Sequence, residues 1–151
     1  MDSNEALPEG HVKVEETGAS HFQERITLGR HEMIADEPIR SGGADSGPSP
    51  YEFLLAALGS CTAMTVRLYA ERHDLPLNHV SVFLGHERVH HADAADGATG
   101  ALERITRDIQ LEGPELTADD RARLIEVANR CPVHRTLTGK LEIRTQEVPE
   151  S

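Results

Sequence analysis

The chain has 151 residues, and Asp and Glu outnumber Lys and Arg by 26 to 15, which gives a formal net charge of −11. This acidity excludes nucleic acids and anionic membrane surfaces as main partners, because both are negatively charged. The length suits one compact core, so we expect a single domain over residues 1–151 with frayed ends at 1–10 and 148–151.

The first third of the chain predicts a small antiparallel meander. Apolar residues alternate in segments 11–16 (HVKVEE) and 21–28 (HFQERITL), and a third extended piece follows at 31–36 (HEMIAD). Alternate residues from Phe22 to Leu28 share one face if the second segment is extended. These segments are therefore expected to pair as three short strands.

A loop and a long helix are expected next. Segment 39–50 is dense in Gly, Ser and Pro, which is typical of a loop. Ser49, Pro50 and Glu52 then supply an N-cap, a proline at the first helical position and the Glu of a capping box. The helix should end near Arg72. Its inward stripe, spaced three and four residues apart, is expected at Leu54, Leu58, Cys61, Thr65 and Leu68.

Two strands are predicted in the middle of the chain. Segment 79–90 (HVSVFLGHERVH) alternates apolar and polar residues, and segment 104–113 (RITRDIQLEG) does the same with Ile105 and Ile109. Segment 91–101 between them is interpreted as a hairpin tip. The pattern therefore predicts a second antiparallel pair.

A second helix should follow these strands. Thr117 is its expected N-cap, and Pro132 breaks it. Segment 133–139 can form one short helical turn, and segment 141–148 (LEIRTQEV) is predicted as a last strand. The inward positions expected on the second helix are Leu124, Val127, Ala128 and Cys131.

The compartment follows from two further observations. No apolar run approaches the roughly 20 residues that span a bilayer, and the N-terminal segment lacks the basic and apolar regions of a signal peptide. We therefore expect a cytoplasmic protein. In a reducing compartment the two Cys are read as a free pair, a transient disulfide or metal ligands rather than a structural disulfide.

The two cysteines are the main candidates for chemistry. Cys61 and Cys131 each fall on the expected inward stripe of a helix, so two helices packed on one sheet could bring them together. The alternative for both is a buried thiol that only fills the core. Cys131 directly precedes Pro132, and a thiol at a helix N-terminus ionises more readily.

A thiolate at Cys61 would need a cation, because the residue lies in mid-helix. Arg25, Arg30 and Arg40 lie in the meander and its loop. A carboxylate such as Glu52 could orient one of these guanidinium groups, or it could serve only as the partner of the helix cap.

Two longer motifs carry a family resemblance. GGADSGPSPYEFLLAALGSCTAMTVRLYAER, followed by LIEVANRCPVHRTLTG, resembles the OsmC/Ohr family of hydroperoxide-handling thiol proteins. Within this family, the two motifs are more similar to the OsmC-like branch than to the dedicated hydroperoxide resistance proteins. The resemblance implies an α+β fold with curved antiparallel sheets around two central helices, and an intertwined homodimer with active sites at the subunit interface.

The resemblance also implies a reaction. Characterised members reduce organic hydroperoxides: the first Cys attacks the peroxide and becomes a sulfenic acid, and the second Cys resolves it as a disulfide. These positions are Cys61 and Cys131 here. The best-studied members have a Glu ten positions before the first Cys, where this chain has Tyr51 and then Glu52. A shift of one residue rotates a helical side chain by about 100°.

The leading hypothesis is thiol-dependent reduction of organic, and also hydrogen, peroxides through a Cys61 sulfenate resolved by Cys131. Arg25 is the expected guanidinium, with Glu52 as its carboxylate. An external dithiol is the expected reductant, and no cofactor is expected because GGADSGPSP lacks the spacing of a nucleotide-binding loop. The residues expected to form an apolar wall for the substrate are Leu54, Leu58 and Met64.

Two alternatives use the same residues differently. The displaced Glu52 also fits a redox-sensing or small-molecule-binding protein with little peroxidase turnover. A metal site is disfavoured, because His86 and His90 would lie about 13 Å apart at roughly 3.3 Å per residue in a strand. A site built on Cys131 and His134 would lack the usual paired-Cys spacing.

Overall fold

The computed structural model describes residues 7–90 and 101–150. The chain divides into two compact units. The first comprises Met1–Phe53 with Arg144–Ser151, and the second comprises Leu54–Ile143. The predicted hairpin tip lies outside the described residues, apart from its last position. Each unit is described by itself below.

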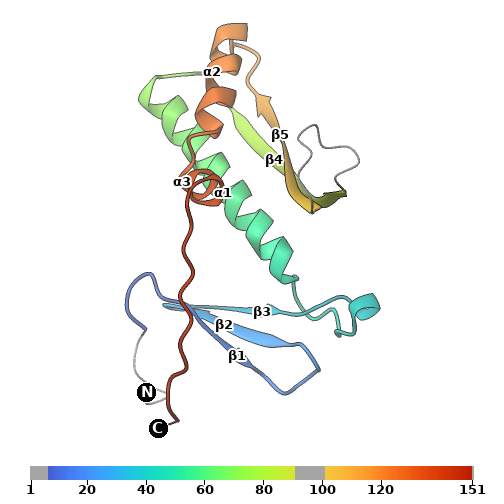
Figure 1. Ribbon diagram of the computed structural model, residues 1–151. Helices are drawn as coiled ribbons and strands as arrows, with labels where there is room; N and C mark the ends of the chain where they lie inside the picture. The colour runs from blue at the N-terminus through green and yellow to red at the C-terminus, as the bar shows by residue number, and fades with distance from the viewer. Residues whose placement is uncertain (1–6, 91–100, 151) are drawn as a thin grey trace. The chain divides into compact units, whose positions relative to one another are not determined.

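The first unit contains the expected meander (Figure 1). Strands β1 (Lys13–Glu16), β2 (Glu24–Leu28) and β3 (His31–Ala35) form an antiparallel sheet in the order β1-β2-β3. The predicted loop that follows contains one turn of 3-10 helix, η1 (Ile39–Ser41). The prediction of three short paired strands is therefore confirmed.

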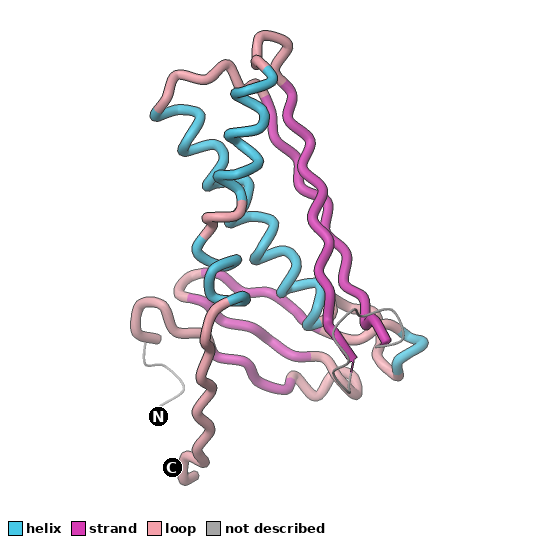
Figure 2. The backbone as a smooth tube through the Cα atoms, turned by 45° about the horizontal axis from the view of Figure 1, so that its top comes forward, coloured by secondary structure: helices cyan, strands magenta, loops and turns pink. Residues whose placement is uncertain are grey.

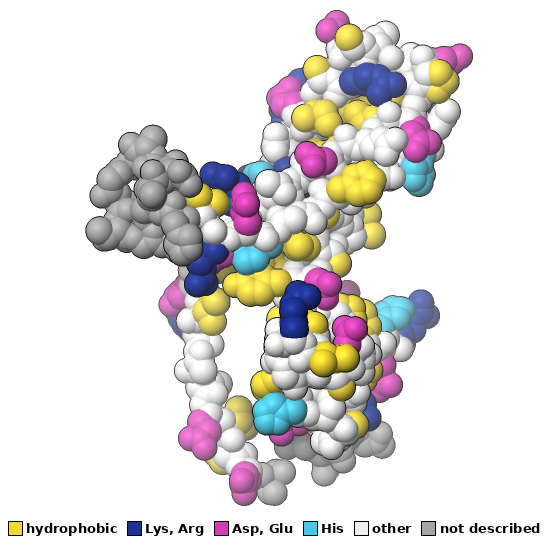
Figure 3. Space-filling model, turned by 90° about the vertical axis from the view of Figure 1, so that its right-hand side faces the viewer, with side chains coloured by type: hydrophobic (Ala, Val, Ile, Leu, Met, Phe, Trp, Pro, Cys, Tyr) yellow, Lys and Arg dark blue, Asp and Glu magenta, His cyan; other side chains and the backbone are white. Residues whose placement is uncertain are grey.

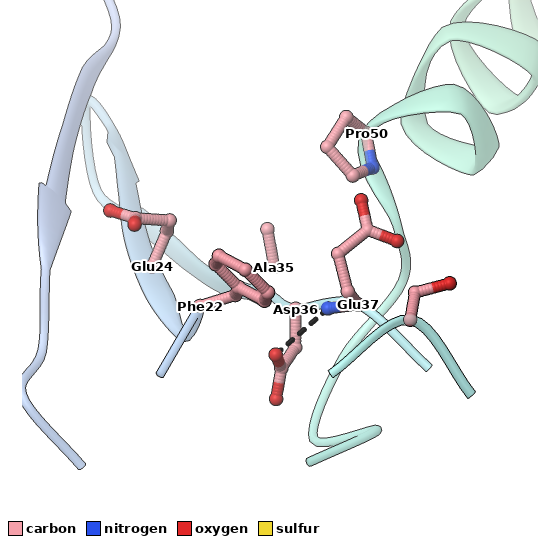
Figure 4. A pocket seen from close by; sticks show the side chains of 7 residues that line it. Phe22, Glu24, Ala35, Asp36, Glu37 and Pro50 are labelled. Atoms are coloured by element: carbon pink, nitrogen blue, oxygen red, sulfur yellow. Dashed lines mark hydrogen bonds between the residues drawn. The ribbon is translucent and has the colours of Figure 1, made fainter. Parts of the chain in front are cut away.

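The loop after β3 is organised around one buried carboxylate, Asp36, which is 2% exposed. Its Oδ1 accepts from the Glu37 N–H at 2.8 Å, and its Oδ2 accepts from the Ala44 and Ser46 N–H groups and the Ser46 hydroxyl. The Ser46 hydroxyl is the main cause that lowers the pKa of Asp36. Figure 4 shows Asp36 beside Glu37 in this loop. A buried carboxylate is stable here because donors satisfy both of its oxygens.

The second unit contains most of the long helix and the second sheet. Helix α1 (Pro50–Arg72) is followed by β4 (His79–His90), β5 (Ala101–Glu112), α2 (Ala118–Ala128) and α3 (Pro132–Thr138). Strands β4 and β5 pair antiparallel, with Val82 opposite Ile109. Figures 1 and 2 show α1 and α2 on the same side of this β-ribbon.

The core of the second unit lies between these helices and the β-ribbon. Leu124 of α2 and Val66 of α1 are both 0% exposed. The other buried members are Ala70, Leu77, Leu116 and Ala128. Val80, Ile109 and Leu111 of the strands pack against them. Burying a Leu or Val side chain contributes about 1.5–3 kcal/mol, so this cluster supplies much of the driving force for folding.

Both predicted helix starts are confirmed. The Glu52 carboxylate accepts from the Ser49 N–H at 2.7 Å, and the Glu52 N–H donates to Ser49 Oγ at 3.4 Å. Thr117 and Asp120 form the same reciprocal pair at the start of α2, at 2.9 and 3.1 Å. The four inward positions predicted for the second helix are all buried.

The predicted inward stripe of α1 is confirmed at Leu58 and is wrong over most of the rest of the helix. The buried residues of this helix are Leu58, Gly59, Thr62, Val66 and Ala70, whereas Cys61 is half-buried and Leu68 is 47% exposed. The stripe thus runs one residue later for most of its length, a rotation of about 100°. Small residues select this face because they allow the helix to approach the strand: a Cβ on Gly59 would lie 2.6 Å from Leu84 Cδ1.

The predicted last strand is also wrong in this chain. Residues 140–150 form no strand and are exposed, with Leu141 at 60% and Ile143 at 81%. Alternation of apolar residues predicts an extended segment, but a strand also needs a neighbouring strand to accept its backbone hydrogen bonds.

One helix has the length and composition of a membrane span, although the sequence shows no long uninterrupted apolar run. This helix is α1, Pro50–Arg72. Its Gly, Ser and Thr residues interrupt the apolar run, whereas its Leu and Ala residues keep the mean hydropathy high. The same helix contributes Val66 and Ala70 to the core, which is also typical of a central helix in a globular fold.

Candidate functional site

The second unit brings the two cysteine side chains together. Cys61 is half-buried on α1, and Cys131 is fully buried at the N-cap of α3. Both are free thiols, and Cys61 is among the groups that lower the pKa of the Cys131 thiol, so the two side chains interact within this unit.

The Cys131 sulfur accepts hydrogen bonds from two further donors. The His134 N–H donates to Sγ at 3.3 Å, as expected for an N-cap, and Pro132 occupies the first position of the helix. The Thr62 hydroxyl lies 3.8 Å from the same sulfur. Donors from α1 and α3 therefore converge on one buried sulfur atom.

A guanidinium from β5 completes the cluster. Arg107 donates to Thr62 Oγ1 at 3.0 Å and to Asn129 Oδ1 at 2.8 Å, and one of its nitrogens lies 3.1 Å from His134 Nδ1. A guanidinium can only donate, so Nδ1 of His134 is the acceptor.

The electrostatics of Cys131 reflect opposing influences. Burial of the sulfur is the largest and raises the pKa of the Cys131 thiol. The His134 N–H, the Cys61 thiol, the Thr62 hydroxyl and the charge of Arg107 lower it. The lowering influences together outweigh burial, so the pKa of Cys131 lies below its ordinary value.

Arg107 is the residue that sequence reasoning missed. Its signal is a charge on the apolar face of a strand: Ile105, Arg107, Ile109 and Leu111 are half-buried, whereas the residues between them are exposed. A charged side chain at a buried-face position of a strand is uncommon unless it has partners. That break in the pattern would have identified it.

The structure places Glu52 and Arg25 in the first unit. The pKa of Glu52 is lowered mainly by the Ser49 N–H, then by the Ser49 hydroxyl, and also by the charge of Arg40. Arg40 is therefore the guanidinium that acts on Glu52 here. Arg25 is exposed on β2, opposite Glu15 and Ile34 in the sheet.

The three apolar residues expected to contact substrate differ in exposure. Met64 is 70% exposed and Leu54 is half-buried, whereas Leu58 is 5% exposed. All three lie on α1 within the second unit. Leu58 is buried, whereas Met64 and Leu54 present apolar surface.

The first unit contains a cleft of about 550 Å³. Figure 4 shows Phe22 and Ala35 among its lining residues, with Glu24 and Glu37 on either side and Pro50 at the start of α1. Both cysteines belong to the other unit. The cleft is apolar with acidic groups in its lining, and it holds none of the residues predicted for the peroxide chemistry.

No group of three potential metal ligands occurs among residues 7–90 and 101–150. His86 contacts Glu103, which also pairs with Arg88. His91 lies outside the described residues, as does the side chain of His90. His134 directs Nδ1 to Arg107 rather than to the Cys131 sulfur.

The sequence profile of the OsmC-like protein family matches residues 42–146, which include both cysteines and all of the second unit. The chain belongs to the OsmC-like family. Its recognition from the two cysteine motifs is therefore confirmed. A search of curated proteins found no significant match.

Solved structures confirm the fold of this OsmC-like protein. An OsmC-like protein from Mycoplasma pneumoniae has a TM-score of 0.67 at 21% identity, with 85% of this chain and 86% of that chain covered. An organic hydroperoxide resistance protein OsmC from Legionella pneumophila has 0.63 at 19%, covering 89% and 93%. The organic hydroperoxide resistance protein OhrB of Bacillus subtilis has 0.54 at 16%, covering 85% and 90%. The predicted α+β class is confirmed.

Proposed function

We propose that this protein reduces organic hydroperoxides, and hydrogen peroxide as a smaller substrate, by thiol chemistry. The observation that carries the proposal is the contact between Cys61 and Cys131, which are far apart in the sequence. The family supports it, and two structures of the same fold are named as organic hydroperoxide resistance proteins.

The difference in exposure between Cys61 and Cys131 supports a division of roles between their sulfurs. Cys61 is the more accessible residue, so its sulfur attacks the peroxide and becomes a sulfenic acid. Cys131 is buried against it and resolves the sulfenic acid as a disulfide. A dithiol from the cytoplasm then reduces the disulfide.

The substrate class follows from the helix around Cys61. Leu54 and Met64 offer apolar surface on the helix that holds Cys61, which favours hydroperoxides with hydrocarbon chains over hydrogen peroxide. We propose Glu52 and an arginine of the first unit, Arg25 in the sequence prediction, as groups that position the peroxide.

A turnover assay tests the proposal. Purified protein is mixed with an alkyl hydroperoxide and an excess of a dithiol, and peroxide loss is followed over many equivalents. Cys61→Ser should abolish turnover, and Ser60→Ala, the exposed neighbour on the same helix, should leave it unchanged. Undiminished turnover in Cys61→Ser would refute the assignment.

The same assay separates the alternative role. A redox-sensing or small-molecule-binding protein would form one Cys61–Cys131 disulfide per molecule and then stop with every dithiol tried. The Glu52 contacts favour this reading, because both the backbone N–H and the carboxylate of Glu52 are engaged with Ser49 at the helix start. Rapid multiple turnover would exclude it.

We also propose that the protein is a homodimer in which residues 1–151 form one domain. Apolar side chains are exposed along the second unit, including Met64 at 70%, Leu68 at 47% and Phe83 at 60%. Figure 3 shows such hydrophobic groups at the surface of the chain. Exposed apolar surface of this kind is typical of a protein interface.

The C-terminal segment supports the same assembly. Residues 141–148 alternate in sequence like a strand but are assigned to no strand, so we propose that a partner subunit supplies the neighbouring strand. Sedimentation equilibrium should give twice the chain mass of 16.6 kDa. Deletion of residues 141–151 should shift the protein toward the monomer, and a monomeric full-length protein would refute the dimer.

A further inference from the structure

Arg107 of β5 contacts the chain on both sides of Cys131. Its Nη2 donates to Asn129 Oδ1 at 2.8 Å, and the same nitrogen lies 3.1 Å from His134 Nδ1. Asn129 precedes Cys131 at the end of α2, and His134 follows it in α3. The guanidinium therefore holds both arms of the turn that carries the Cys131 sulfur.

The same guanidinium also contacts the helix that carries Cys61. Its Nη1 donates to Thr62 Oγ1 at 3.0 Å, and Thr62 directly follows Cys61 on α1. The Thr62 hydroxyl lies 3.8 Å from the Cys131 sulfur. Arg107 thus joins the neighbour of one cysteine to the residues that flank the other.

The shape of the Arg107 side chain couples these contacts, and we call Arg107 with its three acceptors the Arg107 clasp. A guanidinium is planar and its N–H groups point in fixed directions, so three acceptors bound to it cannot move independently. Thr62 is itself held, because its hydroxyl donates to the Leu58 carbonyl at 2.7 Å within α1. The clasp therefore fixes the turn around Cys131 relative to α1.

Packing alone does not account for Arg107. It is half-buried on a strand face whose neighbouring positions are Ile105 and Ile109. Its acceptors are a hydroxyl, an amide and an imidazole, and it forms no salt bridge within residues 7–90 and 101–150. Partial burial of a charge without an opposite charge costs free energy that an apolar residue would not. Such breaks in the local pattern are typical of functional sites.

We propose that Arg107 is a positioning residue for the Cys61–Cys131 disulfide: it holds the turn that carries Cys131 against α1, so that the two sulfurs can join. The inference deepens the proposed function and rests on it, because it assigns a role within the resolving step. Arg107 acts on the geometry of the pair and does not contact the peroxide in this role.

The step that the clasp assists is the closure of the disulfide. The Cys131 sulfur attacks the sulfur of the Cys61 sulfenic acid, the S–S bond forms and the S–O bond breaks. The departing hydroxyl takes the proton of the Cys131 thiol and leaves as water. The Cys131 sulfur is oxidised by one electron and the Cys61 sulfur is reduced by one, so the step is balanced.

The clasp should also favour the disulfide at equilibrium. In the reduced protein it already restricts the turn around Cys131, so less conformational entropy is lost when the S–S bond forms. Without the clasp, the bond itself must impose this restriction. The equilibrium between the disulfide and an external dithiol therefore reports on the clasp without any peroxide.

The first test measures this equilibrium. The protein is incubated with mixtures of reduced and oxidised dithiothreitol, which exchange two electrons with the cysteine pair. Free thiols are then alkylated, and the disulfide fraction is read from the protein mass. Arg107→Met should lower the equilibrium constant of the Cys61–Cys131 disulfide about tenfold, which corresponds to about 30 mV in reduction potential. An unchanged constant would overturn the proposal.

Two further variants separate the planar fork from its charge and from its strand. Arg107→Lys keeps the charge but presents a single nitrogen, so its constant should stay close to that of Arg107→Met. Full recovery in Arg107→Lys would show that charge alone acts and would refute the positioning role. Arg104→Met is the matched control, because Arg104 is exposed on β5 and pairs with Glu87. It should keep the wild-type constant, and a loss as large as that of Arg107→Met would also refute the role.

Asn129 provides a pair of variants that decides the question if Arg107→Met fails to fold. Asn129 is exposed at the end of α2, so the fold should tolerate its substitution. Asn129→Ala removes the acceptor of Arg107 Nη2 and should lower the equilibrium constant, though less than Arg107→Met. Asn129→Asp keeps an acceptor oxygen and should restore the constant. Equal constants in Asn129→Ala and the wild-type protein would overturn the clasp.

The second test follows the two chemical steps in a single turnover. Reduced protein is mixed with one equivalent of an alkyl hydroperoxide, and sulfenic acid and disulfide are measured against time. Arg107→Met should slow the conversion of sulfenic acid to disulfide about tenfold more than it slows sulfenic acid formation. Equal slowing of both steps would show that Arg107 acts only through the general integrity of the fold, which would overturn the proposal.

Failure of the inference and failure of the proposed function give different results. A wild-type protein that reduces no peroxide would refute the peroxidase, whereas the dithiothreitol equilibrium would still show whether the Arg107 clasp acts on the pair. Rapid turnover by the wild-type protein, together with an unchanged equilibrium constant in Arg107→Met, would keep the peroxidase and refute the inference.

Discussion

The two compact units of the chain hold their structure by different means. The second unit has a packed apolar core around Val66 and Leu124, whereas the described residues of the first unit include only Ala35 and Asp36 as buried side chains. The first unit therefore depends on its sheet and on hydrogen bonds to one carboxylate. The two cysteines of the proposed reaction lie in the second unit, which has the packed core.

The largest expected effect is the loss of stability when a buried residue of the second unit is truncated, compared with a half-buried residue of the first unit. Leu124→Ala should lower the free energy of unfolding by about 2–5 kcal/mol, because it leaves a cavity at a site with 0% exposure. Ile26→Ala, at a half-buried position of β2, should cost less. Urea unfolding at fixed protein concentration measures both. Equal losses would show that the first unit has a full core in solution.

Substitution of one glycine from each unit provides a second comparison of stability. A Cβ on Gly47 would lie 2.2 Å from the Ile34 carbonyl oxygen, which is backbone, so Gly47→Ala should cost about 1–3 kcal/mol. A Cβ on Gly59 would meet only the end of the Leu84 side chain, which can rotate. Gly59→Ala should be close to neutral in the same unfolding experiment. A larger loss of stability for Gly59→Ala than for Gly47→Ala would contradict the view that the loop around Gly47 is the more rigid of the two sites.

The two helix caps predict a smaller difference. Thr117→Ala should destabilise by about 1 kcal/mol, because Thr117 Oγ1 accepts from the Asp120 N–H at 3.1 Å. Ser49→Ala should cost less, since the corresponding distance to the Glu52 N–H is 3.4 Å. Thermal unfolding of each Ala variant is compared with that of the unsubstituted protein. A larger loss for Ser49→Ala would contradict the geometry.

The smallest effect is confined to acid pH and to one loop. The pKa of Asp36 is lowered in the folded state, so its contribution to stability is present above the unfolded value of about 3.9 and is lost as pH falls through the folded value. Amide exchange of residues 37–46 should therefore quicken in that window. Asp36→Asn should remove the pH dependence, and Asp45→Asn in the same loop should retain it.

Much of the fold could be predicted because its signals are local. Caps at Ser49 and Thr117 and alternation in 79–90 depend on neighbours within a few residues, and each was predicted at the correct place. The inward face of α1 was not, because small residues such as Gly59 and Thr62 are selected by the closeness of β4 rather than by hydrophobicity. The strand predicted at 141–148 failed since pairing is not local.

The candidate site likewise combines residues with local sequence signals and residues whose contacts are non-local. Both cysteines were proposed from their motifs, because the positions that hold them carry local signals in the sequence. Arg107 was missed because its importance depends on contacts with Thr62 and His134, from parts of the chain that the sequence does not join. A search for charges on apolar strand faces would have proposed it.

The position of Cys131 at the start of α3 links oxidation to backbone order. Its sulfur serves as the helix cap for the His134 N–H. A sulfur in a disulfide carries no negative charge and is a weaker acceptor, so oxidation should loosen the first turn of this seven-residue helix. The conformation of residues 132–138 would then depend on the redox state of Cys131, so a molecule that binds this surface would be sensitive to that state.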